Sequence, residues 1–566
     1  MAPPDTLRIA LAQCNPHPGA MERNADRLLA LRAEAAAQGA DLLLTPELGI
    51  AGHAPQDLPR LPDVQAACDA ALARLAAATA DGGPGMVVGG PWAEGGRRFD
   101  AVTLLDGGRV VARRARHAPS GEDGFDPGPA PGPVAFRGIR LGLLPGEDAW
   151  TPEVAETLAE SGAELLLSTH ASPFVLGRSD RRVERAVPRV VETGLPFVFL
   201  NRIGGLGEGV ADGASFVLNA DCSLAATLPA FAEALAVTDW SRDGQGGWRC
   251  AARPLLPWLG EEEATWRALV LGLRDHVERN GCPGVVLDLA GGPGAALAAA
   301  CAVDALGAGR VRGVLLPGPD TTAERLEEAE ACAGRLGLRC ATVPLAPALD
   351  AFAALLAPAL APLPPGDSRE GAAREAIPPR ARAAALLALS DATGDLPLAT
   401  VDRSGLAVGE AAPGDGFALL KDLYRTDLLR LARWRNANRP AGLLGPEGPV
   451  VPERAIAAPP VRDGLPPQPA LDAILHGLVE REAGVEALVA EGLDREAVRR
   501  VWRLLAEGAY KRRQSPPGLT LFARPNGRDR RAPITHGYTA AAATGGAPPP
   551  VPPEARGDRR QPEPVA

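Results

Sequence analysis

The sequence predicts two α/β domains, the first layered from strand pairs and helices and the second built around a parallel sheet with a helical extension. The chain has 566 residues, which is more than one hydrophobic core usually serves. Short strands alternate with helices from Leu7 onward, and strand pairs occur in the first half. In the second half, strand-helix-strand units follow one another and give way to helices after Asp422.

Short apolar runs in the first half predict strands, and longer amphipathic runs predict helices. We expect strands at 7–13, 41–46, 86–90, 102–106, 110–114, 141–144, 165–168, 197–201 and 215–218, and helices at 24–38 and 63–80. The Gly107-Gly108 pair predicts a hairpin between two of these strands. A Gly-rich stretch at 241–256 is expected to be a linker.

The second half predicts a second set of elements. We expect strands at 285–289, 311–316, 339–344 and 397–401, and helices at 261–280, 322–336, 380–393, 425–438, 470–483 and 495–508. Residues 358–371 are expected to form a Pro-rich loop, and residues 537–566 a disordered tail. The predicted domain boundaries are therefore 1–240, a linker at 241–260, 261–536, and the tail.

A glycine-rich segment joins the predicted strand at 285–289 to an Ala-rich helix. It contains Gly291, Gly292 and Gly294. Backbone N–H groups of such a loop and the positive end of the following helix form a typical phosphate site. The loop nevertheless has no Lys, Ser, Thr or carboxylate to complete that site.

Composition excludes several classes of protein. The net charge of -10 argues against a nucleic-acid groove. No apolar run approaches the ~20 residues of a membrane span, and the N-terminus does not resemble a signal peptide, so a cytoplasmic protein is expected. The eight cysteines form no Cys-x-x-Cys pair and the seven histidines have no metal-ligand spacing, which predicts neither a disulfide framework nor a zinc site.

Lysine is rare in this chain. Of the 59 basic residues, only Lys421 and Lys511 are lysine. One interpretation is that a functional constraint keeps them there. The alternative, which the sequence leaves open, is that they are ordinary paired surface charges.

Many stretches, taken in order over about residues 7–536, resemble the glutamine-dependent NAD⁺ synthetase family. The first half is similar to its nitrilase-like glutaminase domain at Thr45-Pro46-Glu47-Leu48, Val88-Gly89-Gly90-Pro91-Trp92, Glu147-Asp148-Ala149-Trp150, Ser172-Pro173-Phe174 and Asp212-Gly213-Ala214-Ser215-Phe216. The second half is similar to its ATP-dependent synthetase domain at Val303-Asp304-Ala305-Leu306-Gly307, Lys421-Asp422, Leu471-Asp472-Ala473-Ile474, Tyr510-Lys511-Arg512-Arg513-Gln514 and Gly527-Arg528-Asp529-Arg530-Arg531. The resemblance implies an α-β-β-α domain followed by a Rossmann-like domain of the adenine nucleotide α-hydrolase type.

The family's glutaminase uses a Glu-Lys-Cys triad, which the resemblance places at three positions here. Glu47 stands at the position of the base, Arg116 replaces the lysine, and Gly146 replaces the nucleophilic cysteine. Arginine's planar fork is a poor geometric substitute for an ammonium. Because glycine has no nucleophile and neither Cys14 nor Cys222 is expected on a comparable turn, we predict that glutamine hydrolysis is absent.

The family's second domain is a ligase that uses ATP and Mg²⁺ to activate deamido-NAD⁺ for amidation by ammonia. Its Ser-Gly-Gly-x-Asp-Ser loop appears here as Ala290-Gly291-Gly292-Pro293-Gly294-Ala295, and its Thr-Gly-Asn-Lys-Ser-Glu stretch as Thr400-Val401-Asp402-Arg403-Ser404-Gly405. Both metal carboxylates have become glycine, although Asp415 still aligns with an acidic position. The sequence therefore predicts no metal ligands and weak ATP or Mg²⁺ binding. Asp288, before the loop, is expected in a salt bridge or cap.

Two hypotheses follow from this resemblance. The first is a pseudoenzyme that binds ATP or deamido-NAD⁺ weakly, or partners an active paralogue in a homo- or hetero-oligomer, as the family assembles into oligomers. The second is a residual NAD⁺ synthetase that uses free ammonia.

Overall fold

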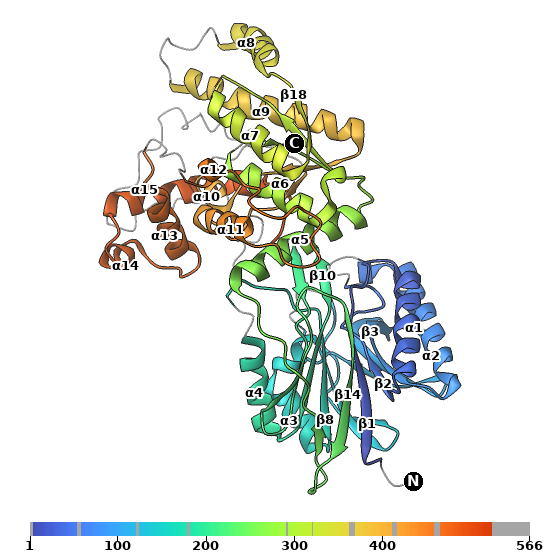
Figure 1. Cartoon of the computed structure of the whole chain (residues 1–566). Helices are drawn as coiled ribbons and strands as arrows, with labels where there is room; N and C mark the ends of the chain where they lie inside the picture. The colour runs from blue at the N-terminus through green and yellow to red at the C-terminus, as the bar shows by residue number, and fades with distance from the viewer. Residues whose placement is uncertain are drawn as a thin grey trace, which may run out of the picture.

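The computed structural model describes residues 4–53, 58–119, 124–177, 181–289, 292–319, 321–360, 368–409, 416–457 and 464–522. The side chains of 360, 368–376, 510 and 511 are outside this description. The chain forms two bodies, one in the blue-to-green part of Figure 1 and one in the green-to-red part. Within the described residues, no helix has the length and apolar character needed to cross a membrane.

The first body has two sheets packed face to face. One sheet contains β15 (Trp248–Cys250), β14 (Ala234–Arg242), β1 (Thr6–Gln13), β2 (Leu42–Leu44), β3 (Gly85–Glu94), β4 (Arg97–Asp106) and β5 (Arg109–Ala115), in that order. The other contains β13 (Leu224–Thr227), β12 (Phe216–Leu218), β9 (Phe197–Asn201), β8 (Leu165–His170), β7 (Ile139–Pro145) and β6 (Val134–Phe136). Leu11 and Leu104 of the first sheet share one buried cluster with Leu143 and Leu167 of the second.

Two pairs of helices cover the outer faces of these sheets (Figure 1). Helices α1 (Met21–Ala37) and α2 (Pro62–Ala78) bury Leu28 and Leu75 against the seven-stranded sheet. Helices α3 (Pro152–Glu160) and α4 (Arg181–Thr193) bury Leu158 and Val190 against the six-stranded sheet. The predicted α-β-β-α layering of the first domain is confirmed.

The second body is built on a parallel sheet. Its strands follow the order β18 (Arg339–Thr342), β17 (Val311–Leu315), β16 (Val285–Asp288), β19 (Leu396–Ala399) and β20 (Phe417–Ala418). The helices are α5 (Glu261–Arg279), α6 (Pro293–Leu306), α7 (Ala323–Leu336), α8 (Ala346–Leu360), α9 (Ser368–Thr393), α10 (Arg403–Ala407), α11 (Arg425–Ala437), α12 (Glu453–Ala457), α13 (Gln468–Val479), α14 (Val485–Ala490), α15 (Arg495–Glu507) and α16 (Ala509–Arg513). All of its strand pairs are parallel, which confirms the Rossmann-like prediction.

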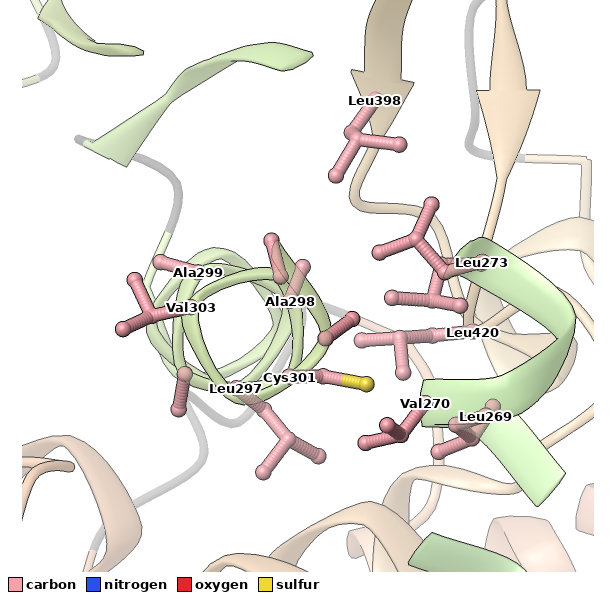
Figure 2. Close-up of a cluster of buried hydrophobic side chains, with 14 of the residues drawn as sticks. Leu269, Val270, Leu273, Leu297, Ala298, Ala299, Cys301, Val303, Leu398 and Leu420 are labelled. Carbon is pink, nitrogen blue, oxygen red and sulfur yellow. The ribbon is translucent and has the colours of Figure 1, made fainter. Parts of the chain in front are cut away.

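Helix α6, which follows the glycine-rich loop, lies in the centre of this core. Figure 2 shows Leu297 and Cys301 of α6 beside Val270 of α5, and both α6 residues are fully buried. The helix is rich in alanine, and its small side chains let neighbouring elements approach it closely.

Two predicted loops differ from the structure. The expected linker at 241–256 is wrong at its start, because Ser241 and Arg242 end β14 and residues 248–250 form β15, paired with β14. The expected Pro-rich loop at 358–371 is helical at both ends, in α8 and α9, and its middle lies outside the described residues. Proline usually indicates the end of a helix, but Pro358, Pro378 and Pro379 lie inside helices in this structure. The hairpin around Gly107-Gly108 is confirmed.

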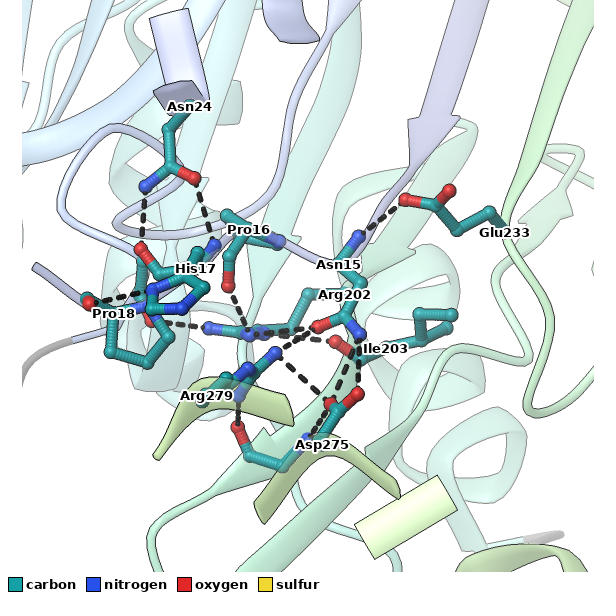
Figure 3. Close-up of polar contacts among 12 residues, drawn as sticks. Asn15, Pro16, His17, Pro18, Asn24, Arg202, Ile203, Glu233, Asp275 and Arg279 are labelled. Carbon is teal, nitrogen blue, oxygen red and sulfur yellow. Dashed lines mark hydrogen bonds and ion pairs between the residues drawn. The ribbon is translucent and has the colours of Figure 1, made fainter. Parts of the chain in front are cut away.

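The two bodies meet where α5 packs on a hairpin of the first, formed by β10 (Ile203–Leu206) and β11 (Gly209–Asp212). Figure 3 shows the polar part of this contact, in which Asn15 Nδ2 donates to Asp275 Oδ2 at 3.0 Å. Gly205 N donates to the same oxygen at 2.7 Å. Arg279 Nη1 donates to Gly205 O at 2.7 Å. Because every donor in this set has an acceptor in the other body, the interface fixes one relative orientation.

Candidate active sites

Gly146 forms a tight turn at the end of an interior strand of the six-stranded sheet. It follows Pro145, the last residue of β7, and begins a 3-10 helix, η3 (Gly146–Trp150). Its φ of +52° lies in the left-handed region that favours glycine. The chain therefore reverses sharply at the position where the resemblance expects the nucleophile.

The structure brings the three predicted glutaminase residues together. Arg116 Nη1 lies 3.4 Å from Glu47 Oε1 and 3.4 Å from Asp100 Oδ2, and these side chains are buried. Ala171 N donates to Glu47 Oε2 at 2.8 Å. A Cβ atom on Gly146 would lie 3.0 Å from Glu47 Cδ and 3.3 Å from Arg116 Nη1, and would overlap Glu47 Oε1. The Glu47 carboxyl thus lies where a side chain at 146 would start.

Asp100 is a site residue that the sequence analysis missed. Burial, then the charge of Asp100 and a hydrogen bond with it, raise the pKa of Glu47 well above its usual value, while Arg116 and the Ala171 N–H act in the opposite direction. One signal could have revealed Asp100: it is an acidic residue inside an apolar strand, β4, and such residues need a polar partner.

Glu147 and Asp148, next to the turn, have different surroundings. Asp148 is fully buried, accepts hydrogen bonds from the backbone of His117 and Ala118 at 2.9 Å, and pairs with Arg114 at 3.4 Å. Burial raises the pKa of Asp148. The side chain of Glu147 is exposed. Within this motif, Asp148 fixes the backbone at His117 and Ala118 next to the turn, and Glu147 faces solvent.

Ser172 and Cys14 take no part in this cluster. Ser172 is held by Asn201, which accepts from Ser172 N at 2.9 Å and donates to Ser172 O at 3.0 Å. Cys14 is buried and its pKa is raised to about 12 by burial, so it is a neutral thiol rather than a thiolate nucleophile.

The glycine-rich loop of the second body begins after β16 and ends at α6. Gly292, with a φ of +84°, caps α6, while Ala290 and Gly291 lie outside the described residues. Gly294 and Ala295 are buried in the first turn of α6. A Cβ atom on Gly294 would lie 2.8 Å from the Thr400 carbonyl oxygen, which is closer than atoms normally pack.

Gly405 lies in the first turn of α10. Its N–H donates to Oδ1 of the capping residue Asp402 at 2.8 Å. The other oxygen of Asp402 pairs with Arg425 at 2.7 Å. Near the loop, Asp288 pairs with Arg382 at 3.7 Å, which confirms the predicted salt bridge. Asp415 is outside the described residues.

These groups do not fit Mg²⁺. The two motif positions expected to supply carboxylates are Gly294 and Gly405, and the nearby Asp402 and Asp288 face arginines. In the part of the chain that the structure describes, no group of three or more His, Cys, Asp or Glu side chains could hold a metal ion.

Arg403 is fully buried between two carboxylates. It pairs with Asp422 and Glu480, and its guanidinium lies 5.1 Å from the ring centre of Tyr424 and 4.7 Å from that of Phe522. The second oxygen of Asp422 accepts from the backbone of Leu521 and Phe522 at 2.7 and 2.8 Å. The positive charge in this motif is therefore neutralised inside the protein.

Lys421 joins the two bodies. Its side chain is 4% exposed, and Nζ lies 2.6 Å from Glu208 Oε1 in the turn between β10 and β11. Glu208 Oε1 also accepts from Gly518 N at 3.1 Å. Lys421 is thus a paired but buried charge rather than a surface one, and the side chain of Lys511 is outside the described residues. No sequence signal marks Glu208, since it lies in a glycine-rich turn far from its partner.

Comparison with known proteins covers the whole architecture. The carbon-nitrogen hydrolase family model matches residues 8–249, and the NAD synthase model matches residues 265–515. The glutamine-dependent NAD(+) synthetase of Rhodobacter capsulatus is 40% identical, with 94% of this chain and 99% of that protein covered.

Solved structures agree. The glutamine-dependent NAD+ synthetase from Acinetobacter baumannii, in complex with ADP, is 32% identical with a TM-score of 0.73, covering 94% of this chain and 99% of its own. The enzyme from Cytophaga hutchinsonii is 19% identical with a TM-score of 0.79, covers 95% and 99%, and shows the same fold. The chain belongs to the glutamine-dependent NAD⁺ synthetase family.

Proposed function

We propose that this chain is a pseudoenzyme of its family, without glutaminase activity and with an impaired synthetase centre. The observation that carries the proposal is the environment of Gly146. Amide hydrolysis by this family needs a thiolate, and glycine supplies none. The position from which a thiol would project is taken by the Glu47 carboxyl.

Arg116 supports the same conclusion. Stabilising a tetrahedral intermediate requires a donor aimed at the developing oxyanion. Arg116 instead contacts Glu47 and Asp100, so its charge is used within the protein. Both the nucleophile and the free cation of a glutaminase are then missing.

The proposal for the synthetase centre rests on charge. Adenylyl transfer releases pyrophosphate, whose charge Mg²⁺ and basic side chains normally neutralise. Gly294 and Gly405 offer no carboxylates to the metal, and a side chain at 294 would meet the Thr400 carbonyl. Arg403 is neutralised by Asp422 and Glu480. ATP or deamido-NAD⁺ would bind weakly, through the turn at Gly292 and the N-terminus of α6.

A non-catalytic subunit needs a partner surface, and α8 with β18 supports one. Helix α8 has one acidic residue, Asp350, and no basic residue, yet Phe352 is 39% and Leu355 71% exposed. The edge strand β18 is exposed along its length. An apolar helix of this kind is normally buried. We infer that this face is covered by a synthetase-type subunit, either an active paralogue or a second copy of this chain. The cytoplasmic location of the protein remains a prediction.

Chromatography tests this surface. Leu355→Glu should disrupt the association of subunits and so lower the apparent mass of the purified protein. Glu328→Gln on α7 should leave the apparent mass unchanged. A wild-type protein that is monomeric at every concentration and brings down no synthetase from its own cells would contradict the partner hypothesis.

The alternative function is ammonia-dependent NAD⁺ synthesis. Its specific support is the preserved turn at Gly292, which still presents the N-terminus of α6 to an anion. Purified chain should be incubated with deamido-NAD⁺, ATP, Mg²⁺ and either glutamine or ammonium, with the Rhodobacter capsulatus protein as the positive control. We expect no NAD⁺ and no glutamate above the blank. NAD⁺ formed with ammonium would establish the alternative, and glutamate release would overturn the proposal altogether.

A further inference from the structure

A groove of about 710 Å³ lies on the helical extension, between α15 and residues 464–466. Leu465 and Pro466 form one wall, and Arg499, Arg500 and Arg503 of α15 form the other. This volume is in the range that small-molecule sites occupy. None of its lining residues belongs to the glycine-rich loop, to α10 or to the glutaminase-type site, so the groove is a separate feature of the molecule.

Arg500 spans this groove. Its guanidinium lies directly over Gly464, so that a Cβ atom there would come within 2.6 Å of the Arg500 Cζ atom. Gly464 has a φ of +74°, a conformation that glycine adopts readily. The absence of a side chain at this position lets the guanidinium lie across the groove, with its N–H donors beside the space.

Among the residues that the structure describes, two of the three arginines of this groove have no carboxylate partner. Within the described residues, Arg500 and Arg503 have no hydrogen-bond or ion-pair partner. Arg499 reaches Glu496 at 3.2 Å through Nη1, but its buried Nε has no acceptor. On the same helix, Arg495 pairs with Glu486 through both guanidinium nitrogens. Within α15, the two arginines without a partner, Arg500 and Arg503, therefore both line the groove.

The like charges on this face repel one another, and of the three arginines Arg499 has a carboxylate partner, Glu496. Arg499 and Arg503 are four residues apart and Arg500 and Arg503 three apart, which places like charges on one helical face. The helix dipole does not explain these three cations, because α15 has no basic residue in its last turn. An anion held between them would remove the repulsion.

We propose that the groove binds a phosphorylated small molecule of mononucleotide type. Guanidinium groups match phosphate oxygens in a bidentate geometry. Leu465, Pro466 and Leu504 offer apolar contact to a flat base, and Glu496 and Glu507 offer acceptors for sugar hydroxyls. The proposal does not depend on the catalytic state of the two active centres.

Titration calorimetry of the full chain with AMP, in the absence of Mg²⁺, tests the proposal. The double variant Arg500→Gln/Arg503→Gln should weaken AMP binding at least tenfold. Arg495→Gln, on the same helix but paired with Glu486, is the matched control and should leave the Kd unchanged. Binding should also weaken as salt rises, because the arginines are exposed.

A second variant separates this groove from the glycine-rich loop. Gly292→Ala disturbs the loop and should not alter the arginine-dependent AMP binding. The proposal is overturned if AMP does not bind, or if Gly292→Ala abolishes binding while the arginine variant retains it. It is also overturned if an acidic peptide binds with arginine dependence while AMP does not, since the groove would then receive a protein segment.

Discussion

The two candidate active centres use their polar residues in different ways. Around Gly146, Glu47 and Arg116 contact each other beside the glycine, where a side chain at 146 would start. In the second domain, Arg403 and Lys421 make structural ion pairs. Arg403 pairs with the carboxylates of Asp422 and Glu480, and Lys421 pairs with Glu208 of the first domain. The polar contacts of the first cluster stay within one domain, whereas Lys421 of the second contacts the other domain.

Motif retention alone therefore does not identify a working site. Lys421 and Asp422 match the family, yet in this structure they bind Glu208, Arg403 and the backbone of 521–522. A residue with such contacts is constrained by stability, whether or not it also touches a ligand. Stability measurements therefore distinguish the two centres.

The largest effect is expected from Asp422→Asn. It removes one of the carboxylates that pair with the buried Arg403, and breaking a buried ion pair costs about 3–5 kcal/mol. Urea unfolding of the full chain measures this loss. Asp239→Asn, at a pair with Arg8 whose side chains are 60% and 44% exposed, should cost at most about 1 kcal/mol. Equal losses in the two variants would refute the structural role of Asp422.

Lys421→Met tests the link between the domains. Loss of the pair with Glu208, a charged hydrogen bond, should cost about 1.5–3 kcal/mol. In scanning calorimetry it should also separate the unfolding of the two domains, because the lost contact joins them. Glu164→Gln breaks a pair with Arg242 inside the first domain and should shift only that domain's transition. If Lys421→Met left a single, unshifted transition, the pair would not couple the domains.

Gly146→Ala tests the other centre. The new methyl group would overlap Glu47 Oε1 and force a φ of +52° on alanine. We expect a loss of roughly 2 kcal/mol in the free energy of unfolding from strain and overpacking. Gly95→Ala is the matched control for backbone strain alone, since its φ is +59° and no atom lies within 4 Å of its Cβ. Equal losses would mean that Glu47 moves aside without cost.

The sequence predicted the fold well because its signals are local. Alternating strands and helices identify both domains, and the glycine-rich stretch predicts the turn before α6. The edge strand β15 was missed because three residues after a Gly-rich turn carry little periodicity. The helical ends of 358–371 were missed because prolines there mark loops in most sequences.

The site residues likewise divide into those that a local sequence motif predicts and those that no local signal marks. Family motifs placed Glu47, Arg116 and Gly146, and the structure brings them together. Asp100 and Glu208 could not be found by spacing, since each acts through contacts between segments distant in the sequence. Only the packed structure shows that Glu47 fills the space beside Gly146, because that requires atomic positions rather than residue types.

The smallest effect is the pH dependence that Glu47 contributes. Its pKa is raised in the folded state above the usual 4.5, so the folded chain binds this proton more tightly than the unfolded chain does. That stabilisation is complete below about pH 4.5 and is lost as the pH rises through the folded pKa. Glu47→Gln removes the titration, and its Tm relative to the wild type should rise with pH over this window.

Thermal unfolding from pH 4 to 8 measures the effect, with the exposed Glu147→Gln as a control that should show no trend. A Tm difference for Glu47→Gln that falls with pH would mean that Arg116 outweighs burial and Asp100, and that Glu47 is ionised when folded. The sign matters for the comparison of the two centres. A neutral Glu47 is an acid held in a buried cluster with Asp100, whereas an ionised one would be a carboxylate paired with Arg116.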